Sequence, residues 1–265
     1  VEVGKSAINP DPMNMIKTEI RKVLGTDLNT YIDKTKTLKI TIYAPQGVEI
    51  AKKTFNHRLG IVGGISILGT SGIVEPMSDE GWKKSLSIEL EMKRAQGLDK
   101  IILVPGNHGE EFIQNELRLD IKYVVRMSNF VGYMLMEAKR MGYKKILLAG
   151  HIGKFIKVSA GIFHTHSKVA DARNEIMISN LALMGAPLEF LQEIDKCVTA
   201  EGAVEIIDQS EYTGVYEILC NKCRDRVKQH LGDDDIEVGV YMFRMDKSYL
   251  AKSDNAESIV EVFRW

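Results

Sequence analysis

The sequence has few cysteines, no excess of either charge and no long apolar run. Three cysteines in 265 residues do not make a disulfide scaffold, so we expect a reducing, cytoplasmic environment. A formal net charge of −1 argues against a dedicated nucleic-acid binder, which usually has a basic excess. No apolar run approaches the roughly 20 residues that span a bilayer, and no charged-then-apolar signal opens the chain. These features are typical of an ordinary globular protein.

The chain begins at Val1 with "VEVGKSAINPDP", which is typical of the middle of a loop. We therefore expect an N-terminal portion of the protein to precede this sequence. Residues 1–77 are mixed, with a helix predicted over 13–24, a strand over 38–43, a short helix over 48–54 and a glycine-rich segment after that. We interpret residues 1–77 as the remnant of a smaller α+β domain.

From Ser78 onward the predicted strands alternate with helices. A helix follows Ser78 and ends at Gly97, and short buried strands are predicted over 100–104, 121–126 and 144–150, with helices after them. Helices dominate residues 171–231, and a late strand covers 236–243, which could pack on either domain. This alternation predicts βαβ units. Residues 78–265 are therefore expected to form a Rossmann-like α/β domain, with a parallel sheet and flanking helices.

Glycine, asparagine and histidine gather where the three predicted strands end, in "PGNHGEEF", "MSNF" and "GHIGKF". Ligands of open parallel sheets bind beyond the carboxyl ends of the strands. We therefore predict contacts with a small polar ligand, such as a nucleoside, from Gly106, Asn107, Gly109, Asn129 and Gly150. The alternative is structural, because the glycines also permit tight strand-to-helix turns and the asparagine can cap its helix.

"GHIGKF" is not a phosphate loop, because Gly150 and Gly153 are too close together and Phe155 stands where a serine or threonine is required. The pair Cys220 and Cys223 has zinc-ribbon spacing but no second pair. It fits the apolar stripe of a helix, so we expect both thiols to pack in a core.

His164 and His166 are the candidate metal ligands. In a strand they would share one face and could chelate a metal, with Asp171 as a third ligand. In a helix they would point in nearly opposite directions. No familiar ligand set is complete nearby, so we expect no protein-bound metal.

Residues 151–173, called the basic segment below, contain three histidines and four cations, Lys154, Lys157, Lys168 and Arg173, against the single acid Asp171. Carboxylates form charge-assisted hydrogen bonds with such side chains. The segment therefore suits a polycarboxylate ligand, whereas the alternative is a solvated helix face.

Taken together, "AINPDPMNMI", "RLGIVGGISILGTSGIVEPMS", "VPGNHGEEF" and the run from "MSNFVGYM" to "HTHSKVADARNE" resemble the cobalt-precorrin-5B C1-methyltransferase family of anaerobic cobalamin biosynthesis. The resemblance runs from about Gly4 through Glu175 and more loosely to the C-terminus. The family's usual alanine-rich beginning, introduced by a Gly-Tyr-Thr-Thr-Gly type motif, is absent. We read the chain as a family member without its N-terminal segment.

The resemblance implies methyl transfer from S-adenosylmethionine to a ring carbon of a cobalt-containing tetrapyrrole, with cobalt arriving only inside this small-molecule substrate. His151 is the first choice and His166 the second for a general base, since imidazole titrates near neutral pH. No nucleic-acid or membrane partner is expected, and homo-oligomer formation is left open. The residues expected to contact the substrate are Lys154, His164, Lys168, Asp171, Arg173, Gly63, Gly64 and Thr70.

Two other functions stay open from the sequence. A metal-dependent hydrolase would use His164 and His166 as ligands. A non-enzymatic tetrapyrrole- or nucleotide-binding module would need only the strand-end residues and the basic segment.

Overall fold

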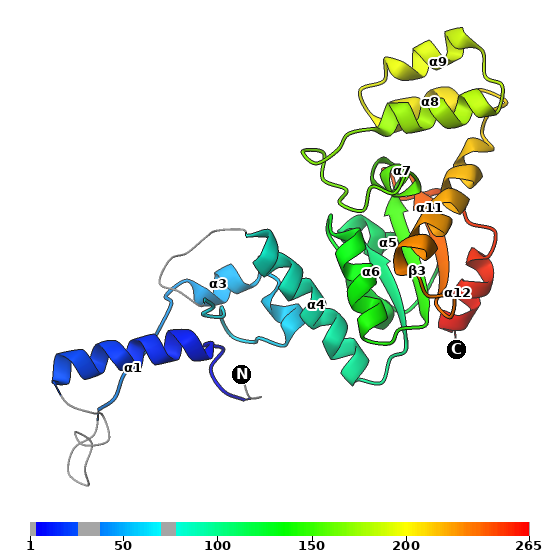
Figure 1. The fold of residues 1–265 in the computed structure, drawn as a ribbon. Coiled ribbons are helices and arrows are strands. Elements are labelled where there is room, and N and C mark those ends of the chain that lie inside the picture. Colours follow the sequence, from blue (N-terminus) through cyan, green and yellow to red (C-terminus); the bar gives the residue numbers. More distant parts are fainter. Residues whose placement is uncertain (1–3, 26–37, 70–77, 265) are drawn as a thin grey trace. The chain divides into compact units, whose positions relative to one another are not determined.

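The computed structural model describes residues 4–25, 38–69 and 78–264. The chain divides into two compact units, Val1–Ser85 and Leu86–Trp265, and Figure 1 shows the elements of each. The predicted domain boundary between residues 77 and 78 adjoins residues outside the described part, and it stays a prediction.

Helix α1 (Pro10–Leu24) is the longest element that lies wholly within the first unit's described residues. It starts three residues earlier than predicted, because proline is favoured in the first turn of a helix. Gly25 ends it in the left-handed conformation, with a φ of 65°. Two short helices, α3 (Gly47–Ala51) and η1 (Asn56–Leu59), follow.

The strand predicted over residues 38–43 is wrong, since these residues are described without regular structure. Ile40 and Ile42 are 49% and 41% exposed, so the apolar side of the alternation covers no core. Alternation predicts a strand only where a partner strand and a buried face exist, and the described residues supply neither.

Helix α4 (Asp79–Ala95) begins in the first unit and ends in the second. Its predicted signals are confirmed. The hydroxyl of Ser78 accepts the N–H of Gly81 at 3.1 Å, and Gly97 has a φ of 87°. Both ends of this helix were therefore readable from local sequence.

The second unit is built on a five-stranded mixed sheet in the order β2-β1-β3-β4-β5. Its strands are β1 (Lys100–Val104), β2 (Val124–Arg126), β3 (Lys145–His151), β4 (Glu237–Phe243) and β5 (Tyr249–Lys252). The α/β class is confirmed, and the first four strands are parallel. The expectation of a parallel sheet is wrong for β5, which pairs antiparallel with β4 after a short turn that leaves no room for a crossover.

The late strand predicted over 236–243 is β4, and it pairs with β3 inside this sheet. The strand predicted over 121–126 is shorter than expected. Its first half is the 3-10 turn η2 (Ile121–Tyr123), in which the carboxylate of Asp120 accepts the N–H of Lys122 at 2.8 Å. An aspartate in this position favours a turn over a ladder.

Helices connect the strands. Helices α5 (Asn107–Asn115), α6 (Val131–Arg140) and α7 (Ile152–Ser159) follow β1, β2 and β3. Between α7 and β4 lie α8 (Arg173–Leu183), α9 (Leu188–Asp195), α10 (Ala200–Ile207) and α11 (Val215–Leu231), and α12 (Ala256–Arg264) follows β5.

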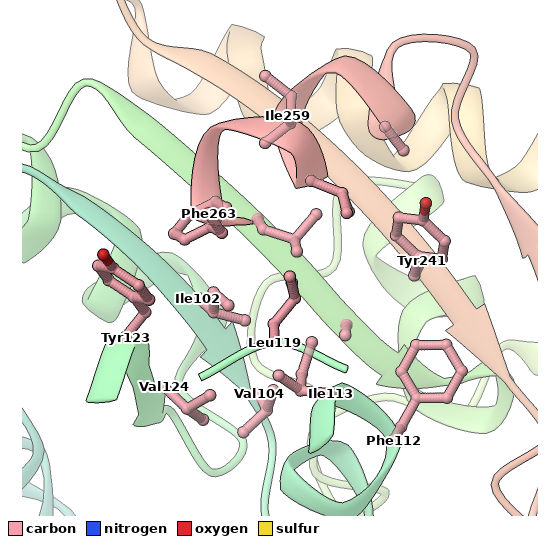
Figure 2. Packing of buried hydrophobic residues seen from close by; sticks show 14 of the residues in the cluster. Ile102, Val104, Phe112, Ile113, Leu119, Tyr123, Val124, Tyr241, Ile259 and Phe263 are labelled. Carbon is pink, nitrogen blue, oxygen red and sulfur yellow. The ribbon is translucent and has the colours of Figure 1, made fainter. Parts of the chain in front are cut away.

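One face of the sheet packs against α5 and α12. Phe112 of α5 stacks on Phe243 of β4 with ring centroids 4.9 Å apart, and Phe263 of α12 meets Tyr123 edge-on at 5.3 Å. Figure 2 shows these helices and the strands closing over a single apolar cluster. This cluster holds α5, which carries the predicted ligand residues, against the strand ends.

The opposite face packs against α7 and α11. Successive strand residues point to opposite faces, so Val240 and Met242 of β4 meet α11 while Tyr241 faces α12. The predicted packing of the cysteines is confirmed, since Cys220 and Cys223 of α11 are fully buried. No helix among the described residues combines the length and apolar composition needed to cross a bilayer.

Candidate functional site at the carboxyl edge of the sheet

The four parallel strands end at one edge of the sheet, called the carboxyl edge below. It comprises residues 105–109, 127–130, 151–154 and 244–246. In this sheet β2 lies on one side of β1, and β3 lies on the other side of β1. Strand order therefore reverses between β1 and β3, and the crevice at such a reversal is the usual ligand site of open α/β sheets.

Gly106 stands at the end of β1, beside this reversal. A Cβ atom placed on it would meet no atom within 4 Å. Its φ of 180° is extended backbone that any residue adopts, so neither packing nor conformation accounts for a glycine there. Asn107 opens α5 next to it with an exposed side chain. Both predicted residues face open space at the reversal.

Gly109 and Gly150 have a structural explanation. A Cβ on Gly109 would lie 2.6 Å from Cβ of Val104, and one on Gly150 would lie 2.2 Å from the ring of Phe155. The two glycines let α5 and α7 approach the sheet closely. Their contribution to a ligand site is to place the helices that surround it.

Asn129 and Lys154 were predicted to serve different ligands, and the structure brings them together. The Nζ atom of Lys154 donates to Oδ1 of Asn129 at 2.6 Å. Burial lowers the pKa of Lys154, and the neighbouring Lys157 lowers it further. Ser128, one residue earlier, has a φ of 52°, an uncommon backbone conformation for a residue other than glycine.

His151 caps α7 and joins three segments of the edge. Its Nδ1 accepts the backbone N–H of Gly153 at 3.1 Å, and its Nε2 lies 2.6 Å from Oε1 of Glu201 in α10. Because Nδ1 accepts, a neutral ring carries its hydrogen on Nε2 and donates it to Glu201. Glu201 also accepts the N–H of Met245, after β4, at 3.0 Å. Both imidazole nitrogens are engaged, so a base role requires one contact to open.

Glu201 is a residue that sequence reasoning missed. It lies 50 residues from His151 in the chain, inside a helix whose acids are otherwise typical of a solvated face. No local pattern marks it. Only the folding of α10 over the end of β3 brings this carboxylate to the imidazole.

The two acids of "PGNHGEEF" are already compensated. Glu110 forms an ion pair with Arg126 at 2.5 Å, and Glu111 forms one with Lys247 at 2.5 Å. The hydrogen bond from Lys247 lowers the pKa of Glu111. The acids therefore contribute little uncompensated negative charge to this edge.

The basic segment is less uniformly available than its charge count indicated. Lys157 is only 3% exposed, and its Nζ donates to the carbonyl oxygens of Thr165 and Ala170 at 2.5 and 3.2 Å. Arg173 makes a two-pronged contact with Asp171 at 2.6 and 2.8 Å. Lys168 is exposed. Lys157 thus organises the 160–170 loop, while Lys154 and Lys168 keep donors for a ligand.

His164 and His166 do not form the strand pair that a chelate needs. Their ring centroids are 6.5 Å apart, and the ring of His164 packs edge-on against Phe130 at 5.1 Å. Nδ1 of His166 accepts the N–H of Lys168 at 3.1 Å, which leaves Nε2–H of this half-buried ring as a donor. Among the described residues, no group of three or more His, Cys, Asp or Glu is placed to hold a metal ion.

Three predicted substrate residues belong to the first unit or fall outside the described part. Gly63, with a φ of 79°, and Gly64 lie in Val1–Ser85, and a Cβ on either would meet nothing within 4 Å. Thr70 lies outside the described residues.

Arg244, at the end of β4, holds a second network that sequence reasoning missed. Its guanidinium donates to both carboxylate oxygens of Asp208 at 2.6 and 3.1 Å, and the hydroxyl of Tyr216 donates to Asp208 at 3.0 Å. The bond from Arg244 lowers the pKa of Asp208 below its usual 3.8. The stability that ionised Asp208 contributes is therefore present above pH 3.8 and is lost as the pH falls through its lowered pKa.

An Asp208→Asn variant should be less stable than the unmodified protein by about 1 kcal/mol or less at neutral pH, since the pair is partly exposed. The difference should shrink as the pH falls below 3.8. Urea unfolding at a series of pH values measures it. A difference that stays constant down to the acid limit would show that the ion pair contributes no pH-dependent stability.

Two family models match parts of this chain. The family model described as CbiD matches residues 1–76, and the model described as CbiD, C-terminal domain, matches residues 164–254. No solved structure matches the chain.

Three curated relatives are named cobalt-precorrin-5B C(1)-methyltransferase. The one from Clostridioides difficile (strain 630) is 70% identical over 99% of this chain and 65% of its own length. The one from Listeria monocytogenes serovar 1/2a (strain ATCC BAA-679 / EGD-e) is 52% identical over 100% of this chain and 69% of its own length. The one from Tolumonas auensis (strain DSM 9187 / NBRC 110442 / TA 4) is 48% identical over 99% and 68%. The chain thus spans about two thirds of these relatives.

Proposed function

Because this chain belongs to the CbiD family of cobalt-precorrin-5B C(1)-methyltransferases, we propose that it takes part in methylating C1 of cobalt-precorrin-5B, a cobalt-containing tetrapyrrole of anaerobic cobalamin biosynthesis. The methyl donor is S-adenosylmethionine, which the name methyltransferase implies. We propose that the methyl donor binds at the carboxyl edge, because Gly106 borders open space beside the reversal of strand order.

The residues present fit a nucleoside with an amino-acid tail. Gly106 leaves the backbone open to close approach, and the exposed amide of Asn107 can both donate and accept hydrogen bonds. Gly109 and Gly150 act by letting α5 and α7 pack closely around the crevice. Asn129 acts through Lys154, whose Nζ it fixes.

When bound, S-adenosylmethionine supplies an electrophilic methyl group on a sulfonium. The task of this chain is to hold the donor and the accepting ring carbon in line and close together. Asn107 orients the donor at the end of β1. Lys154 and Lys168 bind carboxylates of the tetrapyrrole, Arg173 joins them through a guanidinium that Asp171 orients, and His164 fixes the backbone turn that presents His166.

The two histidines take different parts in this scheme. His151, held by Glu201 and Gly153, keeps the first turn of α7 and the loop after β4 in place, and it accepts a proton only when Gly153 releases Nδ1. His166, whose Nδ1 accepts the N–H of Lys168, is proposed to donate its Nε2–H to a substrate oxygen. For Gly63, Gly64 and Thr70 the substrate contact stays a prediction.

Residues 78–265 are proposed to form a Rossmann-like domain, because the parallel strands follow a doubly wound order. Residues 1–77 are proposed to be part of a smaller domain, whose described elements are helices. Three free cysteines, two of them buried, suit a protein of the reducing cytoplasm.

A Gly106→Val variant should bind S-adenosylhomocysteine about tenfold more weakly or worse, since filling the ligand's space costs about 1.4 kcal/mol or more. Stability should change little, because the space beside Gly106 is open. Titration calorimetry of the chain measures the affinity. Ala182→Val, an exposed change in α8, is the matched control.

These measurements test the position of the donor site and the methyl-transfer function separately. Equal affinity of Gly106→Val and the control for S-adenosylhomocysteine would show that the donor binds elsewhere than at the carboxyl edge. No binding by the unmodified chain, and no methyl transfer to cobalt-precorrin-5B in its presence, would overturn the function.

A further inference from the structure

The second unit contains a pocket that the carboxyl edge does not use. It has a volume of about 420 Å³ and is lined by the last turn of α7, by α8 and by α11. Helix α7 follows its N-cap His151 on the carboxyl edge and runs roughly 12 Å along its axis to Ser159. The volume lies within the roughly 300–1,000 Å³ of small-molecule sites. The pocket shares no lining residue with the proposed methyl-transfer site and is large enough for a ligand.

Two cations of α11 line this pocket, and both contact neutral partners. The Nζ atom of Lys222 donates to Oδ1 of Asn180 at 2.5 Å, and Nη1 of Arg226 donates to Oε1 of Gln229 at 3.1 Å. They lie four residues apart, so they share a helix face. Neither forms an ion pair within the described part of the chain. Each keeps N–H donors that no carboxylate satisfies.

The single acid of the lining does not neutralise them. Asp225 is held by Arg224, which lies outside the pocket lining, at 2.8 Å. The carboxylate of Asp225 is directed to that guanidinium, and its side chain is 63% exposed. The pocket therefore carries two cations whose charge the lining leaves uncompensated.

The inner wall is polar and fixed in place. Asn180 is 3% exposed, and its Nδ2 donates to the carbonyl of Ile176 at 2.7 Å, so its Oδ1 holds the ammonium of Lys222 at the wall. The hydroxyls of Ser159 and Ser179 donate to helix carbonyls at 2.7 and 3.0 Å. Their oxygens are left as acceptors. The wall thus offers cations for an anionic group and hydroxyl oxygens for a donor.

We propose that this pocket between α7, α8 and α11 binds a small organic anion that carries a carboxylate or phosphate group and at least one hydroxyl. Lys222 and Arg226 form charge-assisted hydrogen bonds with the anionic group. The serine oxygens accept from the ligand hydroxyl. Binding there uses none of the residues proposed for methyl transfer.

Titration calorimetry with glycerol 3-phosphate and with citrate tests the site, with glycerol as the uncharged probe and ionic strength held constant. The unmodified chain should bind one or both anions and not glycerol. Arg226→Gln, a change on an exposed side chain, should weaken binding about tenfold, the usual effect of one charge-assisted contact. Lys222→Gln with Arg226→Gln should abolish detectable binding.

A charge-matched control is Lys228→Gln with Lys196→Gln, which removes two exposed cations outside the pocket lining. This variant should keep the affinity of the unmodified chain. Preference for glycerol 3-phosphate or for citrate identifies the anionic group, and either preference supports the site. Equal weakening in the control and the pocket variants, or no binding of either anion by the unmodified chain, overturns it.

Discussion

A Gly150→Ala variant should lose about 1–3 kcal/mol of unfolding free energy, the usual cost of overpacking a core. The added Cβ would lie 2.2–2.5 Å from three atoms of the Phe155 ring. Phe155 is fully buried, so the ring has no free space into which it can turn. Either the ring or the first turn of α7 must shift, and His151 is attached to that turn.

Urea unfolding measures the loss as a lower midpoint at constant slope. Gly106→Ala is the matched control, because its Cβ would meet nothing, and it should change stability by about 0.5 kcal/mol or less. Phe155→Leu should partly rescue Gly150→Ala, with a coupling of about 0.5–3 kcal/mol between the two positions. If the losses of unfolding free energy from Gly150→Ala and Phe155→Leu were strictly additive, the Phe155 ring would not be what excludes a side chain at position 150.

A Phe112→Ala variant should cost about 3–5 kcal/mol, the usual range for a buried phenylalanine. Its ring is fully buried, stacks on Phe243 and meets Tyr241 at 6.2 Å. Figure 2 shows it where α5 covers the end of β4. Because α5 begins with Asn107 and is preceded directly by Gly106, loosening it should weaken S-adenosylhomocysteine binding as well.

Thermal or urea unfolding measures the stability, and calorimetry the affinity. Phe112→Leu keeps most of the apolar volume and should cost less than about 1.5 kcal/mol. The affinity should follow the stability order of the two variants. A Phe112→Ala protein that is destabilised but binds with unchanged affinity would separate the donor site from the position of α5.

Local sequence patterns correctly predicted the elements whose structure depends on residues close by in the chain. The run "KIILV" is β1 without any change of bounds, and Ser78 and Gly97 bound α4 as expected. The apolar stripe of α11 buries Cys220 and Cys223. These features follow from caps, periodicity and apolar runs, which act within a few residues.

The same patterns did not predict the structure of segments whose conformation depends on a partner far away in the sequence. Residues 38–43 alternate like a strand but have no described partner. The antiparallel strand β5 was missed because it depends on its pairing with β4. The helix α12 was also missed, although Ala256, Ile259, Val260 and Phe263 recur at helical spacing. The four cations of the basic segment gave no sign that Lys157 is buried beneath the 160–170 loop.

The sequence by itself determined the family, the α/β class and the edge of the sheet where glycine, asparagine and histidine gather. It did so because helix caps, buried strands and long motifs are local signals. Only the tertiary structure decided which glycines are explained by packing and that Gly106 is not. It also decided that Glu201 occupies one nitrogen of His151. Such contacts depend on which distant elements pack together, and that information is spread over the whole chain.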